Sequence, residues 1–233
     1  MRNLALAFCS IRPSQLSDNL CDAREVEYEV CLRQLRRILP DSYDLVICEN
    51  TIDNESQIKR QTLLEFLKEN HSLIIGSKSN IGTVNKGLGE LLMLKVAMES
   101  LDYSKYENVS YISARKIFTC PYAFEKTESL KADALISNPD FLFIDGRFTE
   151  THKDGMYNDM FFSMKSDMMK KYADESYDKL QHLSNNSIGS EQNLFSFINR
   201  NGVSYEWLNW LGLLRNDWQD PKNPFDVKNI HVC

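Results

Sequence analysis

Short apolar runs alternate with amphipathic segments along the first half of the chain. The apolar runs have the length of buried strands, whereas the amphipathic segments repeat their apolar residues at helical spacing. Strands are therefore expected over residues 4–11, 44–48, 73–75 and 109–113, and helices over residues 23–39, 55–69 and 86–101. Because strands and helices alternate, this half is expected to build a largely parallel sheet.

The second half has a less regular pattern. Residues 118–137 mix turn and helix signals, and the tail from Tyr205 onward contains all three tryptophans. Strands are expected over residues 141–146 and 157–164, and helices over residues 166–177 and 190–199, the last with Ser190 as its N-cap. The expectation is one α/β domain over residues 1–233, with a mostly parallel central sheet flanked by helices and a mixed, more irregular C-terminal half that shares this sheet.

Composition and charge narrow the class of protein. Of the 233 residues, 42% are hydrophobic and 26% are charged, as in soluble globular proteins. The formal net charge of −6 argues against a non-specific nucleic-acid binder. Every apolar run is shorter than the roughly 20 residues that span a bilayer, and the six cysteines show no C-x-x-C spacing. A cytoplasmic protein without a transmembrane segment is expected, with association at a membrane surface left open.

The most informative segment is the polar loop between the strand at 73–75 and the helix at 86–101. A glycine- and asparagine-rich loop between a strand and a helix presents backbone N–H groups to an anion, and this favours a phosphate-bearing ligand. Gly82 and Gly87 have the gap of a P-loop, but Leu88 stands where its lysine must be. The glycines do not fit G-x-G-x-x-G either. Ordinary ATPase and dinucleotide sites are therefore disfavoured.

Six motifs, in this order, carry a resemblance to a known family. They are Ser10-Ile-Arg12, Glu49-Asn50-Thr51, Asn80-x-Gly82-x-x-Asn85-Lys86-Gly87, Tyr111-Ile-Ser113-Ala-Arg115, Tyr157-Asn-Asp-Met-Phe-Phe and Gly189-Ser-Glu-Gln192. Over roughly residues 3–200 the chain resembles glycosyltransferases of the GT-A type, in particular small sugar transferases of bacterial surface-polysaccharide and large-virus origin. The resemblance implies a nucleotide-sugar site in residues 1–116 and an acceptor site in residues 117–233.

One departure from the family pattern concerns the metal. Most GT-A enzymes hold Mn²⁺ or Mg²⁺ with an Asp-x-Asp motif after the fourth strand, but this chain contains no Asp-x-Asp, and Ser113-Ala-Arg115-Lys116 stands there instead. Arg115 and Lys86 could neutralise a departing diphosphate without a metal, since arginine offers two parallel hydrogen bonds to phosphate oxygens. Dependence on Mn²⁺ or Mg²⁺ is left open.

The resemblance also assigns candidate residues to the donor, a nucleoside-diphosphate sugar. They are Ser10, Arg12, Glu49, Asn80, Gly82, Asn85, Lys86, Gly87 and Arg115. Ordinary structural roles compete with these assignments. Glu49 could be a solvated loop acid, Arg12 a surface arginine before Pro13, and the asparagines part of a turn.

A carboxylate near the acceptor hydroxyl is needed to take its proton. Asp159 and Glu191 are the candidates, although Glu191 could instead stabilise the start of a helix. Tyr205, Trp207 and Trp210 could stack on a sugar or dock the C-terminal segment onto the core.

The leading hypothesis is transfer of a hexose from a nucleotide sugar to a glycan or lipid-linked acceptor, with inversion preferred and retention open. A catalytically silent nucleotide- or carbohydrate-binding module is the alternative. A methyltransferase ranks last, because the first predicted strand lacks the following glycine-rich turn.

Overall fold

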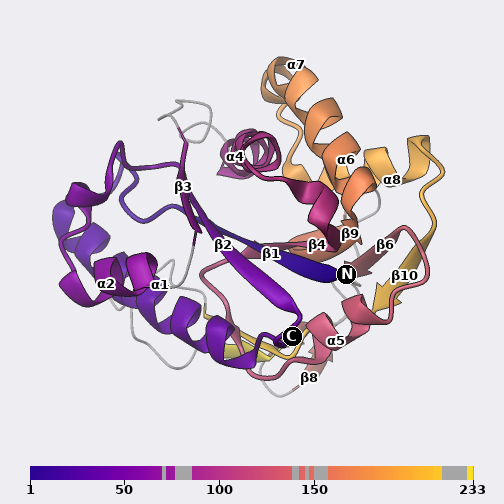
Figure 1. Cartoon of the computed structure of the whole chain (residues 1–233). Coiled ribbons are helices and arrows are strands. Elements are labelled where there is room, and N and C mark those ends of the chain that lie inside the picture. The colour runs from indigo at the N-terminus through magenta and orange to yellow at the C-terminus, as the bar shows by residue number, and fades with distance from the viewer. Residues whose placement is uncertain are drawn as a thin grey trace.

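A mostly parallel sheet forms the centre of the molecule (Figure 1). The structure is a computed structural model that describes residues 1–69, 72–76, 86–137, 142–144, 147–149, 157–216 and 230–232. The strands of this sheet are β1 (Arg2–Cys9), β2 (Tyr43–Glu49), β3 (Ser72–Ile75), β4 (Tyr106–Ser113), β6 (Ala134–Ser137), β9 (Asn158–Lys165) and β10 (Tyr205–Leu208). Their spatial order is β10-β6-β9-β4-β1-β2-β3.

All neighbouring strands of this sheet are parallel except at β9, which runs antiparallel to both β4 and β6. The expected α/β fold with a mostly parallel sheet is confirmed. The chain proceeds from β1 outward to β3 and then returns to place β4 on the other side of β1. This reversal makes the β1/β4 pair a topological switch point, which is where open α/β sheets bind ligands.

Helices cover both faces of the sheet, which explains why its inner strands are apolar runs rather than alternating ones. One face carries α1 (Asp18–Ile38), α2 (Gln61–Glu69) and α5 (Tyr122–Glu128), and the other carries α4 (Lys86–Ser100), α6 (Ser166–Asp178), α7 (Leu180–Asn185) and α8 (Ser190–Arg200) (Figure 1). We call these the α1 face and the α4 face. Alternate residues of β1 point to the two faces, so that Leu4, Leu6 and Phe8 pack on the α4 face.

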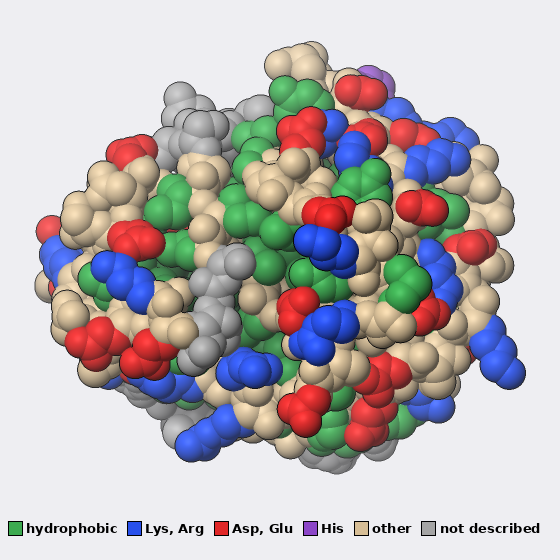
Figure 2. All heavy atoms as spheres, in the orientation of Figure 1, with side chains coloured by type: hydrophobic (Ala, Val, Ile, Leu, Met, Phe, Trp, Pro, Cys, Tyr) green, Lys and Arg blue, Asp and Glu red, His purple; other side chains and the backbone are tan. Residues whose placement is uncertain are grey.

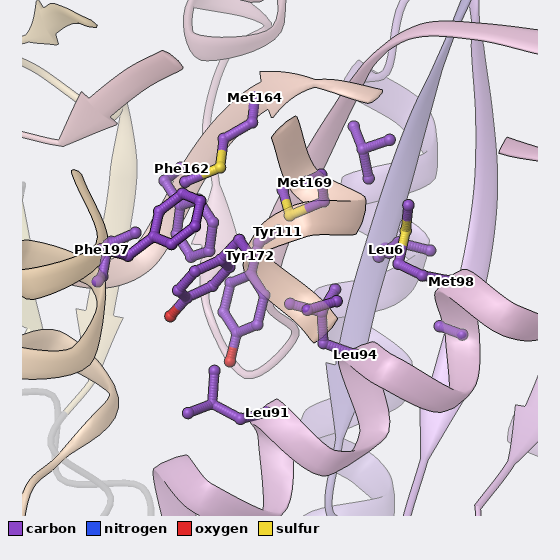
Figure 3. Close-up of a cluster of buried hydrophobic side chains, with 14 of the residues drawn as sticks. Leu6, Leu91, Leu94, Met98, Tyr111, Phe162, Met164, Met169, Tyr172 and Phe197 are labelled. Carbon is purple, nitrogen blue, oxygen red and sulfur yellow. The ribbon is translucent and has the colours of Figure 1, made fainter. Parts of the chain in front are cut away.

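The core of the α4 face is rich in aromatic rings (Figure 3). Tyr111 lies stacked between Phe8 and Phe162, with ring centroids 4.4 Å and 4.7 Å away. Tyr172 packs edge-to-face against Phe162 and Phe197. The hydroxyl oxygens of Tyr111 and Tyr172 point to the same side of this cluster (Figure 3).

A second, smaller sheet was not expected. It consists of β5 (Ile117–Phe118), β7 (Leu142–Ile144), β8 (Arg147–Thr149), β11 (Leu213–Asn216) and β12 (Ile230–Val232), in the order β5-β11-β12-β7-β8. All its strand pairs are antiparallel. The two halves do share the main sheet, to which the second half contributes β6, β9 and β10, but the tail strands β11 and β12 pair with β5 and β7 in this second sheet.

The helix expected over residues 55–69 is interrupted. It consists of a short 3₁₀ turn, η1 (Glu55–Gln57), followed by α2; a second such turn, η2 (Tyr103–Lys105), precedes β4. The carboxylate of Glu25, on α1, accepts hydrogen bonds from the backbone N–H groups of Lys59 (3.2 Å) and Arg60 (2.6 Å). These bonds satisfy donors just before α2 from a distant part of the chain, as a capping side chain does locally.

The surface carries mixed charge. On the face seen in Figure 2, acidic and basic side chains are interspersed. Among the helices that the structure describes, none combines the length and the apolar character needed to cross a bilayer.

Candidate functional site

The parallel strands of the main sheet all end at one edge, which we call the carboxyl edge. It is formed by Cys9, Glu49, Ile75, Ser113, Ser137 and Leu208, together with the start of the antiparallel strand at Asn158. Ligands of open α/β sheets bind at this edge. The residues expected to contact the donor follow these strand ends, so the structure shows which of them lie together.

Glu49 fixes two of the loops at this edge. Its carboxylate is fully buried; Oε2 accepts a hydrogen bond from the Ile11 N–H (2.9 Å), and Oε1 accepts from the Thr51 N–H (2.5 Å) and from the Thr51 hydroxyl. Burial raises the pKa of Glu49, and these hydrogen bonds oppose the rise. Both oxygens thus hold the loops after β1 and β2, and a direct contact with a nucleobase or ribose stays a prediction.

Arg12 is held in a similar way. Its guanidinium pairs with Asp18 (3.0 Å), Asp22 (2.9 Å) and Glu25 of α1, and its backbone N–H donates to Thr51 Oγ1 (2.8 Å). Burial lowers the pKa of Arg12, but the hydrogen bonds to Asp22 and Glu25 outweigh it and the pKa is raised overall. The expected contact with a phosphate would require these ion pairs to break.

Ser10 joins the end of β1 to α1 and to the next loop. Its N–H donates to the Tyr28 hydroxyl (2.8 Å), its carbonyl accepts from Arg24 Nε (3.0 Å) and Nη2 (2.7 Å), and its hydroxyl donates to Asn50 Oδ1 (3.3 Å). Arg24 therefore lies over the end of β1. This brings a cation to the switch point that was not singled out from the sequence.

Arg115 lies on the same side of the switch point. Its Nε is 3.1 Å from Oε2 of Glu27, a carboxylate of α1 that is almost completely buried. Burial raises the pKa of Glu27, and Arg115, Arg24 and Lys116 oppose the rise. Three cationic side chains are thus within electrostatic reach of this carboxylate, beside the ends of β1 and β4.

The end of β4 offers poor ligands for a divalent cation. Ser113 and Ala114 are buried, and Arg115 is itself a cation. In the described parts of the chain, no three His, Cys, Asp or Glu side chains form a group that could hold a metal ion. The described residues at this strand end therefore do not fit Mn²⁺ or Mg²⁺.

Asp159 occupies an irregular part of β9. Ile136 pairs with Phe162, but the next residue of β6, Ser137, pairs with Asn158, so that the three residues between them in β9 bulge out of the ladder with β6. Bulges often redirect a side chain beside an active site. Asp159 lies in this bulge, and its Oδ2 accepts a hydrogen bond from the Ser190 hydroxyl.

Two helix N-termini meet at Asp159. A Cβ atom added to Gly87, the second residue of α4, would lie 2.2 Å from Ser190 Oγ and 2.9 Å from Ser190 Cβ. Only glycine therefore lets the start of α4 approach the start of α8 so closely. The positive ends of both helix dipoles favour an ionised carboxylate at this position.

The expectation that Ser190 is the N-cap of α8 is wrong. Gly189, not Ser190, is the N-cap of α8, and its N–H donates to Oε1 of Gln192 (3.1 Å). Because Ser190 is the first helical residue, its hydroxyl is directed to Asp159 rather than to the helix backbone. Glu191 follows it, with its backbone carbonyl accepting from the Tyr157 N–H (3.3 Å).

Tyr111 and Glu90 form a buried polar contact near Asp159. The Tyr111 hydroxyl donates to Glu90 Oε2 at 2.5 Å. Burial raises the pKa of Tyr111 strongly, and the charges of Glu90 and Asp159 raise it further. From the sequence, Glu90 is expected either to favour the dipole at the start of its helix or to have an indirect role in the site, and this contact is compatible with both.

Most of the glycine- and asparagine-rich loop lies outside the described residues. Lys86 is the first residue of α4, but its side chain, together with Asn80, Gly82 and Asn85, lies outside the described residues. Of the expected loop contacts, only Gly87 can be placed.

The remaining candidates form two groups at the carboxyl edge. Ser10, Arg12, Glu49 and Arg115 contact residues of α1 or of the loops on the α1 face. Gly87, Asp159 and Glu191 lie with the starts of α4 and α8 on the other face. The edge itself joins the two groups, because β1, β4 and β9 are consecutive neighbours in the sheet.

A solved structure shares this fold. The chain is similar to the crystal structure of a protein from Desulfovibrio desulfuricans G20 that carries a provisional assignment as a nucleotide-diphospho-sugar transferase. The TM-score is 0.57 and the identity 16%, over 90% of this chain and 80% of that chain. At this identity the likeness shows the fold alone. No protein-family model matches the chain, and no curated protein sequence matches it.

Proposed function

We propose that the chain is a glycosyltransferase of the GT-A type that moves a sugar from a nucleoside-diphosphate sugar to a hydroxyl of a glycan or lipid-linked acceptor. The observation that supports it best is the arrangement along the carboxyl edge. The cationic side chain of Arg115 lies at the β1/β4 switch point, and the carboxylate of Asp159, bonded by Ser190, lies on the neighbouring strand β9. The provisional assignment of the structurally similar protein agrees with this proposal.

The donor diphosphate is proposed to bind beside Arg115. Glu27 holds the Nε of Arg115 at 3.1 Å, and in the described part of the chain the two terminal nitrogens of Arg115 have no hydrogen-bond partner. These nitrogens can therefore donate to phosphate oxygens. Negative charge grows on the diphosphate as it leaves, so a fixed cation stabilises the transition state more than the bound donor.

Asp159 is the proposed general base. The acceptor oxygen forms a bond to the anomeric carbon, its proton passes to Asp159, and the bond from that carbon to the diphosphate oxygen breaks with inversion. Asp159 is preferred to Glu191 because the bulge in β9 and the bond from Ser190 fix its position. Glu191 lies in the first turn of α8, where an acid also has a purely structural use.

A catalytically silent binding module is the second candidate. It is favoured by the internal bonds of Glu49 and Arg12, because both side chains are already engaged within the protein. Such a module would bind a nucleotide sugar without breaking its glycosidic bond.

Donor hydrolysis in the absence of acceptor separates the two candidates. We expect slow release of free sugar from one of UDP-, GDP- or dTDP-linked hexoses, found first by the rise in melting temperature that the bound donor causes, with and without Mn²⁺. Asp159→Asn should abolish release but keep the thermal shift. Asp167→Asn, at an exposed acid in the first turn of α6, is the matched control and should leave both unchanged. Binding without any sugar release would support the silent module, and no binding of any nucleotide sugar would overturn the proposal.

A further inference from the structure

Three aromatic side chains form a cluster at the free edge of the main sheet, which we call the aromatic platform. Tyr157 precedes β9, and Tyr205 and Trp207 belong to β10. The ring of Tyr157 lies 5.9 Å from Tyr205 and 5.5 Å from Trp207, and Tyr205 and Trp207 are 5.1 Å apart. The three rings are packed mostly edge-to-face, so each holds the others in a fixed orientation.

The platform lies on the same face of the sheet as Asp159. In the parallel pairing of β10 with β6, Tyr205 is opposite Ala134 and Trp207 is opposite Ile136, and both partners belong to the core of the α4 face. Phe195 of α8 packs against Tyr157 at 5.1 Å and closes the inner side of the platform.

The outer side of the platform is exposed. Trp207 is 43% and Tyr205 is 38% exposed, whereas Tyr111, Tyr172 and Phe197 on the same face are buried. Strand β10, which carries Trp207, pairs with β6 on one side, and the described residues provide no strand on its other side. Two large rings are thus presented to solvent by a rigid strand.

A phenol hydroxyl borders these rings. Tyr157 is buried, which raises its pKa to about 12, and the neighbouring Tyr205 adds to the rise. The hydroxyl of the exposed Tyr205 is therefore the polar group beside the Trp207 ring. A pyranose ring has the complementary chemistry, with an apolar C–H face and a rim of hydroxyl groups. An acyl chain would instead need a continuous apolar groove.

The platform is continuous with the candidate catalytic site. Tyr157 lies two residues before Asp159, and its N–H donates to the carbonyl of Glu191 at 3.3 Å. Strand β10 is two strands away from β9, which corresponds to about 10 Å across the sheet. A ligand that covers the platform can therefore extend along the carboxyl edge to the carboxylate.

We infer that the aromatic platform binds a pyranose unit of the acceptor, and that the acceptor is consequently a glycan chain whose neighbouring unit presents its hydroxyl to Asp159. This inference rests on the proposed transferase function and adds the chemical class of the acceptor. Trp207 supplies the stacking surface, the hydroxyl of Tyr205 binds a hydroxyl group of the sugar, and the buried Tyr157 supports both rings from below.

The test compares Trp207→Ala with Trp210→Ala in the full chain. Trp210 is equally exposed, at 45%, but packs on Tyr122 instead of the platform, so it controls for the loss of an exposed indole. Acceptor KM is measured with a panel of gluco-, galacto- and manno-oligosaccharides, and donor hydrolysis is measured without acceptor. We expect Trp207→Ala to raise the acceptor KM at least about five-fold and to leave donor hydrolysis unchanged. Trp207→Phe should restore most of the affinity, and Trp210→Ala should change neither quantity.

The outcomes separate this inference from the proposed function. If donor hydrolysis proceeds and Trp207→Ala leaves the acceptor KM unchanged, the platform has no role in acceptor binding. The inference is then wrong, while the proposed function stands. If no donor is hydrolysed, the transferase proposal fails, and saturation-transfer NMR with the same oligosaccharides then tests the platform by itself. Binding by the wild type and Trp210→Ala but not by Trp207→Ala supports the platform as a carbohydrate site. Binding of a simple alkyl detergent without any oligosaccharide binding overturns it.

Discussion

Ser190 donates a hydrogen bond from its hydroxyl to Oδ2 of Asp159. This bond links the first residue of α8 to the bulge at the start of β9, and it orients the carboxylate from one side. A hydrogen bond to a charged acceptor stabilises the charged form. Ser190 is accordingly a positioning residue for the proposed base.

Replacing Ser190 by alanine should lower kcat and move the acidic limb of the rate profile to higher pH. The ionised carboxylate loses a donor in this variant, so a higher pH is needed to ionise it, while donor affinity is unchanged. Initial rates between pH 4 and 9 provide the measurement. Ser100→Ala, at the far end of α4, removes a hydroxyl bonded to the Val96 carbonyl and should leave the profile as it is. An unchanged profile in Ser190→Ala would argue that Asp159 does not act as the base.

Gly87→Ala should destabilise the protein. The added methyl group would lie 2.9 Å from the Ser190 Cβ and 3.2 Å from its backbone nitrogen, so rotation of the serine hydroxyl cannot relieve the overlap. We expect a loss of about 1–3 kcal/mol in the free energy of unfolding, despite the higher helix propensity of alanine. Urea denaturation measures it.

A double-mutant cycle with Ser190→Gly tests the cause of that loss. Removing the Ser190 side chain leaves only the backbone contact, so Gly87→Ala should cost less in this background than in the wild type. Equal costs in both backgrounds would show that the close approach of α4 and α8 is not the reason.

Arg115→Ala should weaken binding of a nucleoside diphosphate about ten-fold or more, since charge-assisted hydrogen bonds contribute about 1.5–3 kcal/mol. Arg37→Ala removes the same charge from the exposed last turn of α1 and serves as the control. Calorimetric titration at two salt concentrations measures the affinities. Equal affinity for Arg115→Ala and Arg37→Ala would remove Arg115 from the proposed donor site.

Glu49→Gln should lower the free energy of unfolding by about 1–3 kcal/mol, because the amide NH₂ cannot accept the hydrogen bonds that Ile11 and Thr51 donate. The pH dependence of this difference follows from the raised pKa of Glu49. A carboxyl whose pKa is higher in the folded state binds protons more tightly there, so its contribution is complete below the ordinary value of 4.5. It declines as the pH rises through the folded-state pKa. Thermal unfolding of both proteins from pH 3.5 to 8 should show the largest advantage of the wild type at low pH, and a difference that grows with pH would contradict the assignment.

Local patterns predicted the elements of the first half well, because buried strands and amphipathic helices leave a direct trace in the spacing of apolar residues. The break before α2 left no such trace in the sequence, because it depends on Glu25, more than thirty residues earlier in the chain. Strand β6 was not predicted, because its four residues, Ala134–Ser137, are too few to show an alternation of apolar and polar side chains.

The candidate site could likewise be predicted from the sequence only in part. The sequence predicted which strand ends would carry polar side chains, and those ends lie together at the carboxyl edge. It could not predict how those side chains are used, because Arg12 and Glu49 find their partners only through the pairing of β1 with β2 and the packing of α1. The hydroxyl of Ser190 was likewise assigned to a local cap, although its acceptor lies on another strand.

Strand β9 runs opposite to its two neighbours in the main sheet, so it begins at the ligand edge where they end. Asp159 stands near that beginning, outside the ladder to β6, and the hydroxyl of Ser190 at the start of α8 binds its carboxylate. The position of the proposed base therefore depends on how α8 packs on the sheet. A substitution that shifts the start of α8 would displace the base from both substrates.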